Sequence, residues 1–163
     1  MDELQNIRQS ATIGGKEISI QTGTLAKQAG GSCTIHIGGT VLLCTATVAK
    51  NPKDVSFIPL TVEYRERTYA AGKIPGGFFK REARARDKET IYARCTDRPI
   101  RPMFPDGWNR ETMIYNLLVS MDGKNDAGPL SILGASMALL LSDAPIKDAV
   151  ARVRIGPHAQ TRQ

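Results

Sequence analysis

The stretch CTIHIGGTVLLCTATV, residues 33–48, decides the fold of this 163-residue chain. Residues 33–37 alternate between apolar and polar side chains, which is typical of a half-buried β-strand. Gly38 and Gly39 tolerate the positive φ angles of a two-residue hairpin turn, and the β-branched, apolar run Thr40–Val48 follows directly. The stretch therefore predicts a β-hairpin whose second strand is central in its sheet.

Alternating segments also lie on both sides of this hairpin, at residues 17–21 and 57–64. A polar turn with Pro52 precedes the second of them. We therefore expect the amino-terminal third of the chain to be antiparallel β-structure.

Two helices are predicted after this β-rich third. Asp87 can cap the first, and Pro99 makes Arg98 its last residue because the residue before a proline disfavours helical backbone. Prolines further along then predict an extended connection to the next strand. The remaining predicted elements are a strand at 112–120, a buried helix at 130–141 and a final strand at 150–155.

Composition places the chain among ordinary folded domains. Its residues are 41% hydrophobic and 23% charged, close to globular averages, so a disordered chain is excluded. No apolar run approaches the roughly 20 residues that cross a bilayer, and the start of the chain is polar, which predicts a cytoplasmic protein without membrane contact. Cys33, Cys44 and Cys95 are odd in number and lack C-x-x-C spacing, so we expect buried thiols.

The positive charge is concentrated in one stretch. Residues 65–110 hold 12 basic and 6 acidic residues, whereas the rest of the chain is balanced, so the whole net charge of +6 lies there. Clustered Lys and Arg attract nucleic acids and phosphates. A solvated surface with local ion pairs explains the same charge pattern equally well.

Residues 76–82, GGFFKRE, combine a flexible glycine pair, two aromatic rings and two cations. Aromatic faces stack on unpaired bases and cations follow the phosphates, so Phe78, Phe79, Lys80 and Arg81 are predicted to contact single-stranded RNA. In the alternative interpretation, one phenylalanine fills the core and the other makes a subunit contact.

Three arginines, Arg94, Arg98 and Arg101, follow at spacings that bring them to one side of a helix and its exit. Forked guanidinium groups suit phosphate oxygens, which makes them further candidates for RNA contact. Asp97 competes for these arginines, and we expect it to hold Arg94 or Arg101 in a structural ion pair.

The sequence offers few combinations of residues that could form a catalytic site. His36 and His158 have no ligand spacing around them, and the serines lack a triad. Asp122 and Asp126 flank a loop where they could bind a metal, although Asx turns explain them equally well. No catalytic residue and no metal ligand is therefore assigned within this chain.

A family resemblance emerges from these motifs. The segments GKIPGGFFKRE at 72–82, KET at 88–90 and DRPIRPMFP at 97–105 resemble the first RNase PH-like domain of the polynucleotide phosphorylase (polyribonucleotide nucleotidyltransferase) family. Shorter matches extend the similarity over residues 10–156, and include Gly39–Leu42 and the second helix. The resemblance divides the chain into a partial RNase PH-like domain, 1–156, and a tail, 157–163, that is unlike the family.

The resemblance implies an α+β fold with a mixed β-sheet, βαβ units and packed helices, incomplete at the carboxyl end. It further implies a homotrimeric 3′-to-5′ exoribonuclease in mRNA degradation, with single-stranded RNA and an RNA-degradation complex as partners. Inorganic phosphate is the implied co-substrate, and Mg²⁺ stabilises charge from a site outside this chain. The loop Phe78–Arg81 and the arginines at 94, 98 and 101 match family positions that contact RNA.

Two departures from the family pattern affect these expectations. Lys80 replaces an arginine and loses its planar fork, and residues 83–86 replace the usual Gly-Arg-Pro. The family's phosphorolytic centre belongs to its second RNase PH-like domain, so we expect this chain to be inactive alone. The alternatives are a non-catalytic RNA-binding module and a scaffold subunit of an exosome-like ring.

Overall fold

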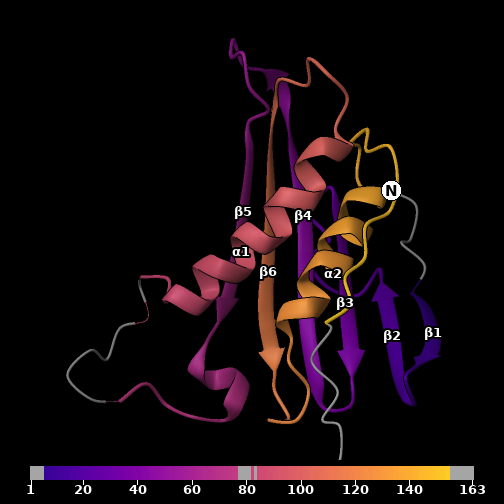
Figure 1. Cartoon of the computed structure of the whole chain (residues 1–163), viewed down its shortest axis with the longest axis vertical. Helices are drawn as coiled ribbons and strands as arrows, with labels where there is room; N and C mark the ends of the chain where they lie inside the picture. The colour runs from indigo at the N-terminus through magenta and orange to yellow at the C-terminus, as the bar shows by residue number, and fades with distance from the viewer. Residues whose placement is uncertain (1–5, 77–81, 83, 155–163) are drawn as a thin grey trace, which may run out of the picture.

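The computed structural model describes residues 6–76, 82 and 84–154 and shows a six-stranded sheet with two α-helices (Figure 1). The strands lie in the order β1-β2-β3-β4-β6-β5. Their bounds are β1 Ile7–Ile13, β2 Lys16–Thr22, β3 Gly31–Ile37, β4 Thr40–Pro52, β5 Leu60–Glu66 and β6 Arg110–Ser120. The helices are α1 Asp87–Ile100 and α2 Gly128–Leu140, with short 3₁₀ turns at Thr68–Ala71 and Arg101–Met103.

The predicted hairpin is confirmed. β3 and β4 pair antiparallel with Ile37 opposite Thr40, and Gly38 adopts φ 56° in the turn. Such a left-handed backbone strains any residue with a side chain. β4 is a central strand, because β6 pairs with its other edge.

The sheet is mixed, which makes the fold α+β as predicted. β6 runs antiparallel to β4 and parallel to β5, and α1 connects the parallel pair as a βαβ unit. Figure 1 shows both helices in front of the sheet. α2 packs especially closely: a Cβ on Gly134 would lie 2.2 Å from the Sγ of Cys44 in β4.

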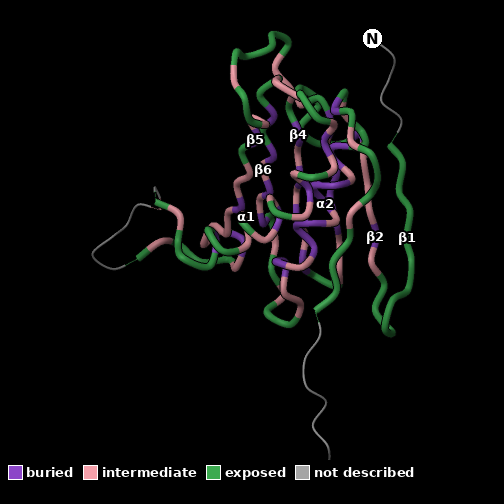
Figure 2. Tube along the Cα trace, turned by 45° about the horizontal axis from the view of Figure 1, so that its top comes forward, coloured by how far each residue is buried: buried purple, intermediate pink, exposed green. Residues whose placement is uncertain are grey.

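One strand escaped the sequence analysis. β1 pairs antiparallel with β2 along its whole length, yet every one of its residues is exposed. Figure 2 shows β1 exposed throughout, whereas buried positions concentrate on the central strands and α2. An edge strand without a buried face lacks the alternation of apolar residues that reveals a strand in a sequence.

Three local predictions were wrong. α1 begins after Arg86 rather than after Asp87, and it passes through Pro99 to Ile100. The expected extended connection is instead the 3₁₀ turn Arg101–Met103. Burial explains the continuation, because Ile100 and Phe104, either side of the turn, are both at least 98% buried.

The final strand predicted at 150–155 was also wrong in its described part. Residues 150–154 form no strand, and the Val150 N–H donates to Ser136 Oγ at 2.8 Å rather than to a strand partner. Ile155 and the predicted tail 157–163 lie outside the described residues. The alternation here was too short to distinguish a strand from an exposed connection.

Candidate nucleic-acid interface

Four element ends meet at one end of the sheet. β5 and β6 are parallel, so their carboxyl ends, Glu66 and Ser120, lie at the same edge (Figure 1). The amino termini of α1 and α2 lie at this end too. Free N–H groups and the helix dipole favour anions at helix amino termini, and crevices beyond parallel strands commonly bind ligands. We call this region the strand-end surface.

A buried carboxylate holds the surface together. Glu89 in the first turn of α1 is only 4% exposed and accepts the N–H groups of Arg86 at 2.6 Å and Glu66 at 2.7 Å. It therefore joins the end of β5 to the start of the helix. Lys88 lies 2.9 Å from the Glu66 carboxylate, but the Lys88 side chain remains 54% exposed. Glu89 is thus bonded to backbone N–H groups, whereas Lys88 is paired with Glu66 and still faces solvent.

The base of the 72–82 segment is anchored to the same surface. Glu82 accepts the backbone N–H of Thr68 at 2.8 Å and its hydroxyl at 2.7 Å, and Arg67 donates to the Glu82 carbonyl. The bonds from Thr68 lower the pKa of Glu82. Phe78, Phe79, Lys80 and Arg81 lie outside the described residues, so their predicted RNA contact stays a prediction.

The start of α2 is occupied by an aspartate. Asp126 accepts the Tyr92 hydroxyl at 2.7 Å, the Gly128 N–H at 3.1 Å and Arg154 at 3.0 Å. Burial acts to raise the pKa of Asp126, but the bonds from Tyr92 and Gly128 lower it. Burial, together with the bond to Asp126, raises the pKa of Tyr92 to about 12. Asp126 therefore supplies a hydrogen-bond acceptor for the first backbone N–H group of α2.

Asp122 closes a turn, in accordance with the Asx alternative. Its carboxylate accepts the N–H groups of Lys124 at 2.8 Å and Asn125 at 2.9 Å, and the Thr40 hydroxyl at 3.0 Å. The backbone bonds hold the pKa of Asp122 well below its usual range. Among the described residues, no three His, Cys, Asp or Glu side chains gather as metal ligands.

The structure separates the three candidate arginines. Arg101 is bonded to both carboxylate oxygens of Asp97, at 2.7 and 3.1 Å, and to two carbonyl oxygens at and just before the start of β5. This confirms that Asp97 holds one of them structurally, at the end of the sheet opposite the strand-end surface. The RNA contact predicted for Arg101 stays a prediction, because its side chain is still 39% exposed. Arg94 and Arg98 are exposed and show no ion pair with any described residue, and their RNA contact stays a prediction.

Two hollows run along the strand-end surface, each with a volume of about 230 Å³. Glu66 lines both, so they adjoin. The loop-base hollow is lined by Glu66, Arg67, Thr68, Pro75, Gly76, Glu82, Arg84, Arg86 and Glu89. The strand-end hollow is lined by Glu66, Lys88, Leu118, Met121, Gly123, Lys124, Asn125, Asp126 and Ala127.

Residues 14–145 match the RNase PH model, described as the 3′ exoribonuclease family, domain 1. The chain belongs to this family. The polyribonucleotide nucleotidyltransferase of Endomicrobium trichonymphae is 51% identical over 154 residues, which are 94% of this chain and 22% of that protein. The Myxococcus xanthus polyribonucleotide nucleotidyltransferase is 47% identical over 150 residues, 92% of this chain and 21% of that protein. The chain spans about a fifth of the length of these RNase PH-family relatives.

Solved structures agree on the fold. The Archaeoglobus fulgidus exosome with RNA bound to the active site aligns with a TM-score of 0.54, over 77% of this chain and 51% of that one, at 15% identity. Rice Rrp46 aligns with a TM-score of 0.57, over 91% of this chain and 61% of that one, at 17% identity. At these identities the likeness shows the RNase PH-like fold alone.

Sequence reasoning missed several residues of the interface. Arg84, Arg86 and Lys88 belong to the basic stretch, but nothing in the sequence singled them out from its other cations. Lys124 comes from a loop after β6, far along the chain from the basic stretch. A signal existed for Glu89, since an acid in the first helical turn can accept the capping N–H.

Proposed function

We propose that this chain is the RNA-guiding part of a 3′-to-5′ phosphorolytic exoribonuclease, a polyribonucleotide nucleotidyltransferase. The observation that carries the proposal is the pairing of close relatives of that name with the exposed side chains of Arg84, Arg86, Lys88 and Lys124 at the strand-end surface. In the reaction, an oxygen of inorganic phosphate attacks the terminal phosphodiester. The bond from the phosphorus of that phosphodiester to the 3′ oxygen of the preceding nucleotide breaks, which releases a nucleoside diphosphate, and the 3′ oxygen takes a proton to become the new 3′ hydroxyl of the shortened RNA.

The described residues support a binding role in this reaction. Arg84, Arg86 and Lys88 lie exposed beside the base of the 72–82 segment. Glu66, Glu82 and Glu89 line the same hollow, where Glu66 is paired with Lys88 and Glu89 lies 3.8 Å from Arg86. Arg84 has no carboxylate partner among the described residues, so a strand laid along the surface meets at least this uncompensated cation.

The remaining parts of the proposal concern the whole enzyme. Mg²⁺ is placed outside this chain, where it would stabilise the charge of the transferred phosphoryl group. Inorganic phosphate is the co-substrate, the assembly is a homotrimer, and the enzyme works in the cytoplasm within an RNA-degradation complex. Neither helix among the described residues has the length and apolarity to span a bilayer.

A second candidate is supported by the exposed cations of the strand-end surface, which suit RNA binding whether or not a phosphorolytic centre is present. In that reading the chain binds single-stranded RNA without turning it over. Phosphate-dependent release of nucleoside diphosphates from poly(A) distinguishes the two. We expect no release by this chain alone, and release above a no-protein control would place a working centre within it.

Both candidate functions require the chain to bind single-stranded RNA, and binding of fluorescent oligoadenylate tests this requirement. Phe79→Ala should weaken binding roughly tenfold, because stacking is worth about 1–3 kcal/mol per base. Phe57→Ala is the matched control, since Phe57 is 66% exposed and precedes the opposite end of β5. Equal losses in the two variants, or no binding by the unmodified chain, would reject RNA guidance and leave a scaffold role.

A further inference from the structure

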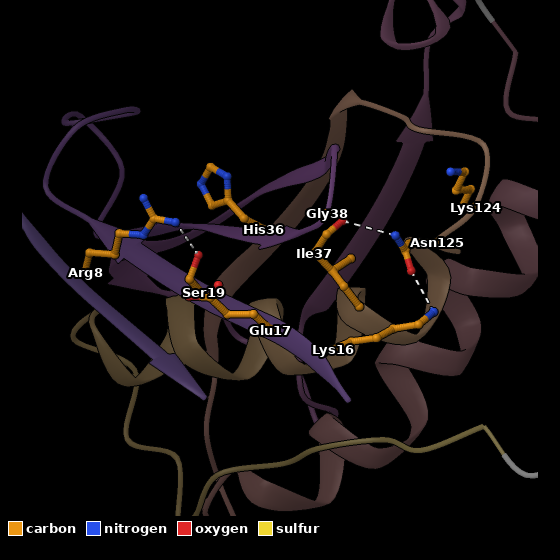
Figure 3. A pocket seen from close by; sticks show the side chains of 9 residues that line it. All are labelled: Arg8, Lys16, Glu17, Ser19, His36, Ile37, Gly38, Lys124 and Asn125. Carbon is orange, nitrogen blue, oxygen red and sulfur yellow. Dashed lines mark hydrogen bonds between the residues drawn. The ribbon is translucent and has the colours of Figure 1, made fainter. Parts of the chain in front are cut away.

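A third and larger hollow lies beside the β3–β4 turn, with a volume of about 420 Å³ (Figure 3). We call it the hairpin hollow. Three segments far apart in sequence form it: the β1–β2 hairpin, the end of β3 and the loop after β6. Its charged lining consists of Arg8, Lys16, Lys124 and Glu17, with His36 and Asn125 beside them.

We propose that the hairpin hollow binds a phosphate group of single-stranded RNA, as a backbone contact additional to the strand-end surface. This inference rests on the proposed function for the identity of the polymer. The chemistry itself, recognition of a phosphate by converging cations, rests on the geometry of the hollow.

Neutral groups hold two of the cations in place. Arg8 donates to the Ser19 hydroxyl at 3.1 Å, and Lys16 donates to the amide oxygen of Asn125 at 2.8 Å (Figure 3). Neither Arg8 nor Lys16 forms an ion pair with a carboxylate among the described residues. A hydroxyl or an amide positions a cation without cancelling its charge, so the attraction for an anion is kept.

The charges lining the hollow sum to an excess of cations. Three basic side chains face one acid, Glu17. His36 adds no charge near neutral pH, because burial and the neighbouring Arg8 both lower its pKa. His36 is held by a 3.0 Å hydrogen bond with the Thr34 hydroxyl. Its ring and the side chain of Ile37 give the hollow a partly apolar wall.

Continuity favours a polymer over a small free anion. Lys124 and Asn125 line the hairpin hollow and also the strand-end hollow, so the two adjoin across this loop. Glu66 in turn connects the strand-end hollow to the loop-base hollow. A strand gripped at the base of the 72–82 segment can therefore continue past Lys124 toward Lys16.

The test compares oligoadenylates of about 6 and about 20 nucleotides, one near the lower end of common single-strand site sizes of about 4–16 nucleotides and one beyond their upper end. In the full chain, the double substitution Arg8→Gln and Lys16→Gln, at two cations that line neither the strand-end hollow nor the loop-base hollow, should weaken binding of the longer RNA about tenfold and leave the shorter one unchanged. Each lost phosphate contact should reduce the slope of log K against log salt by about 0.7. Glu17→Gln should strengthen binding of the longer RNA.

Lys50→Gln is the matched control, because Lys50 is exposed at the far end of β4. The inference would be overturned if the double variant and the control bind the longer RNA with equal affinity. If ADP or inorganic phosphate instead loses affinity in the double variant while RNA does not, the hollow takes a free phosphate and the RNA assignment fails. Failure of the unmodified chain to bind either RNA would reject the proposed function instead.

Discussion

The helix-covered centre of the sheet and the strand-end surface treat their polar groups in opposite ways. In the centre, the Thr96 and Ser131 hydroxyls bond each other at 2.9 Å between α1 and α2, and neither reaches solvent. At the strand-end surface, Glu82 and Glu89 accept backbone N–H groups, whereas Arg84 is exposed and Lys88 is paired with Glu66 but stays 54% exposed. The centre satisfies its polar groups internally, whereas the surface leaves cationic side chains exposed to solvent.

This difference separates what holds the fold from what serves function. A substitution in the centre should reduce stability with no specific effect on RNA. Substitution of a cation at the strand-end surface should weaken RNA binding and leave stability unchanged. Glu89 lies on the boundary, because it ties the surface to α1 by bonds to two backbone N–H groups.

The largest effect is expected in the centre, from Gly134→Ala. The new Cβ would lie 2.2 Å from the Cys44 Sγ and 3.1 Å from the side chain of Ile35, so α2 must shift from the sheet. Overpacking of this kind costs about 1–3 kcal/mol and occasionally more. Urea unfolding measures it, and Gly76→Ala is the control because nothing lies within 4 Å of its added Cβ. Equal stability of the two variants would show that the centre is loosely packed.

Glu89→Ala should have the next largest effect, about 2 kcal/mol, because it leaves two backbone N–H groups without their acceptor. Thermal unfolding gives the loss, and Glu111→Ala, which removes an exposed acid from a surface ion pair with Lys53, serves as the comparison. RNA binding should also fall in Glu89→Ala, because Glu89 positions Arg86 at the strand-end surface. Stability unchanged relative to Glu111→Ala would mean that water replaces this carboxylate at no cost.

The smallest effect concerns pH. Because the folded pKa of Asp126 is lowered, its charged form stabilises the protein above the unfolded value of about 3.9, and this contribution is lost as pH falls through the folded pKa. Asp126→Asn should therefore lower the unfolding temperature near pH 7, with a gap to the unmodified chain that narrows as pH falls below about 3.9. Asp143→Asn, at an exposed site, should show no such gap. A gap for Asp126→Asn that is constant across pH would deny its charge a role.

Local patterns predicted the parts of the fold whose signal is local. The hairpin at Gly38 and the buried helix α2 were predicted correctly, because their periodicity and turn residues lie within one stretch. Burial of Ile100 carried α1 past a proline, which no local rule anticipates. β1 gave no apolar alternation, and the short alternation near Val153 was misleading.

The candidate site was predicted less completely. The basic stretch marked the strand-end surface, and Asp97 was correctly expected to hold an arginine. The hairpin hollow could not be foreseen, since Lys16 and Asn125 meet only through the sheet across 109 residues of chain. Register and the placement of the loop between β6 and α2 decide such encounters, and neither is written in a single segment of sequence.

The most direct test of the account is to map RNA on the chain by amide chemical shifts while oligoadenylate is titrated. We predict perturbed amides at Gly76, at residues 82–88 and at Lys124, with none over the exposed end of α2 at Leu140. These shifts should fade as salt is raised. Shifts that gather at Leu140, or that persist unchanged in high salt, would contradict the claim that the strand-end cations grip an RNA backbone.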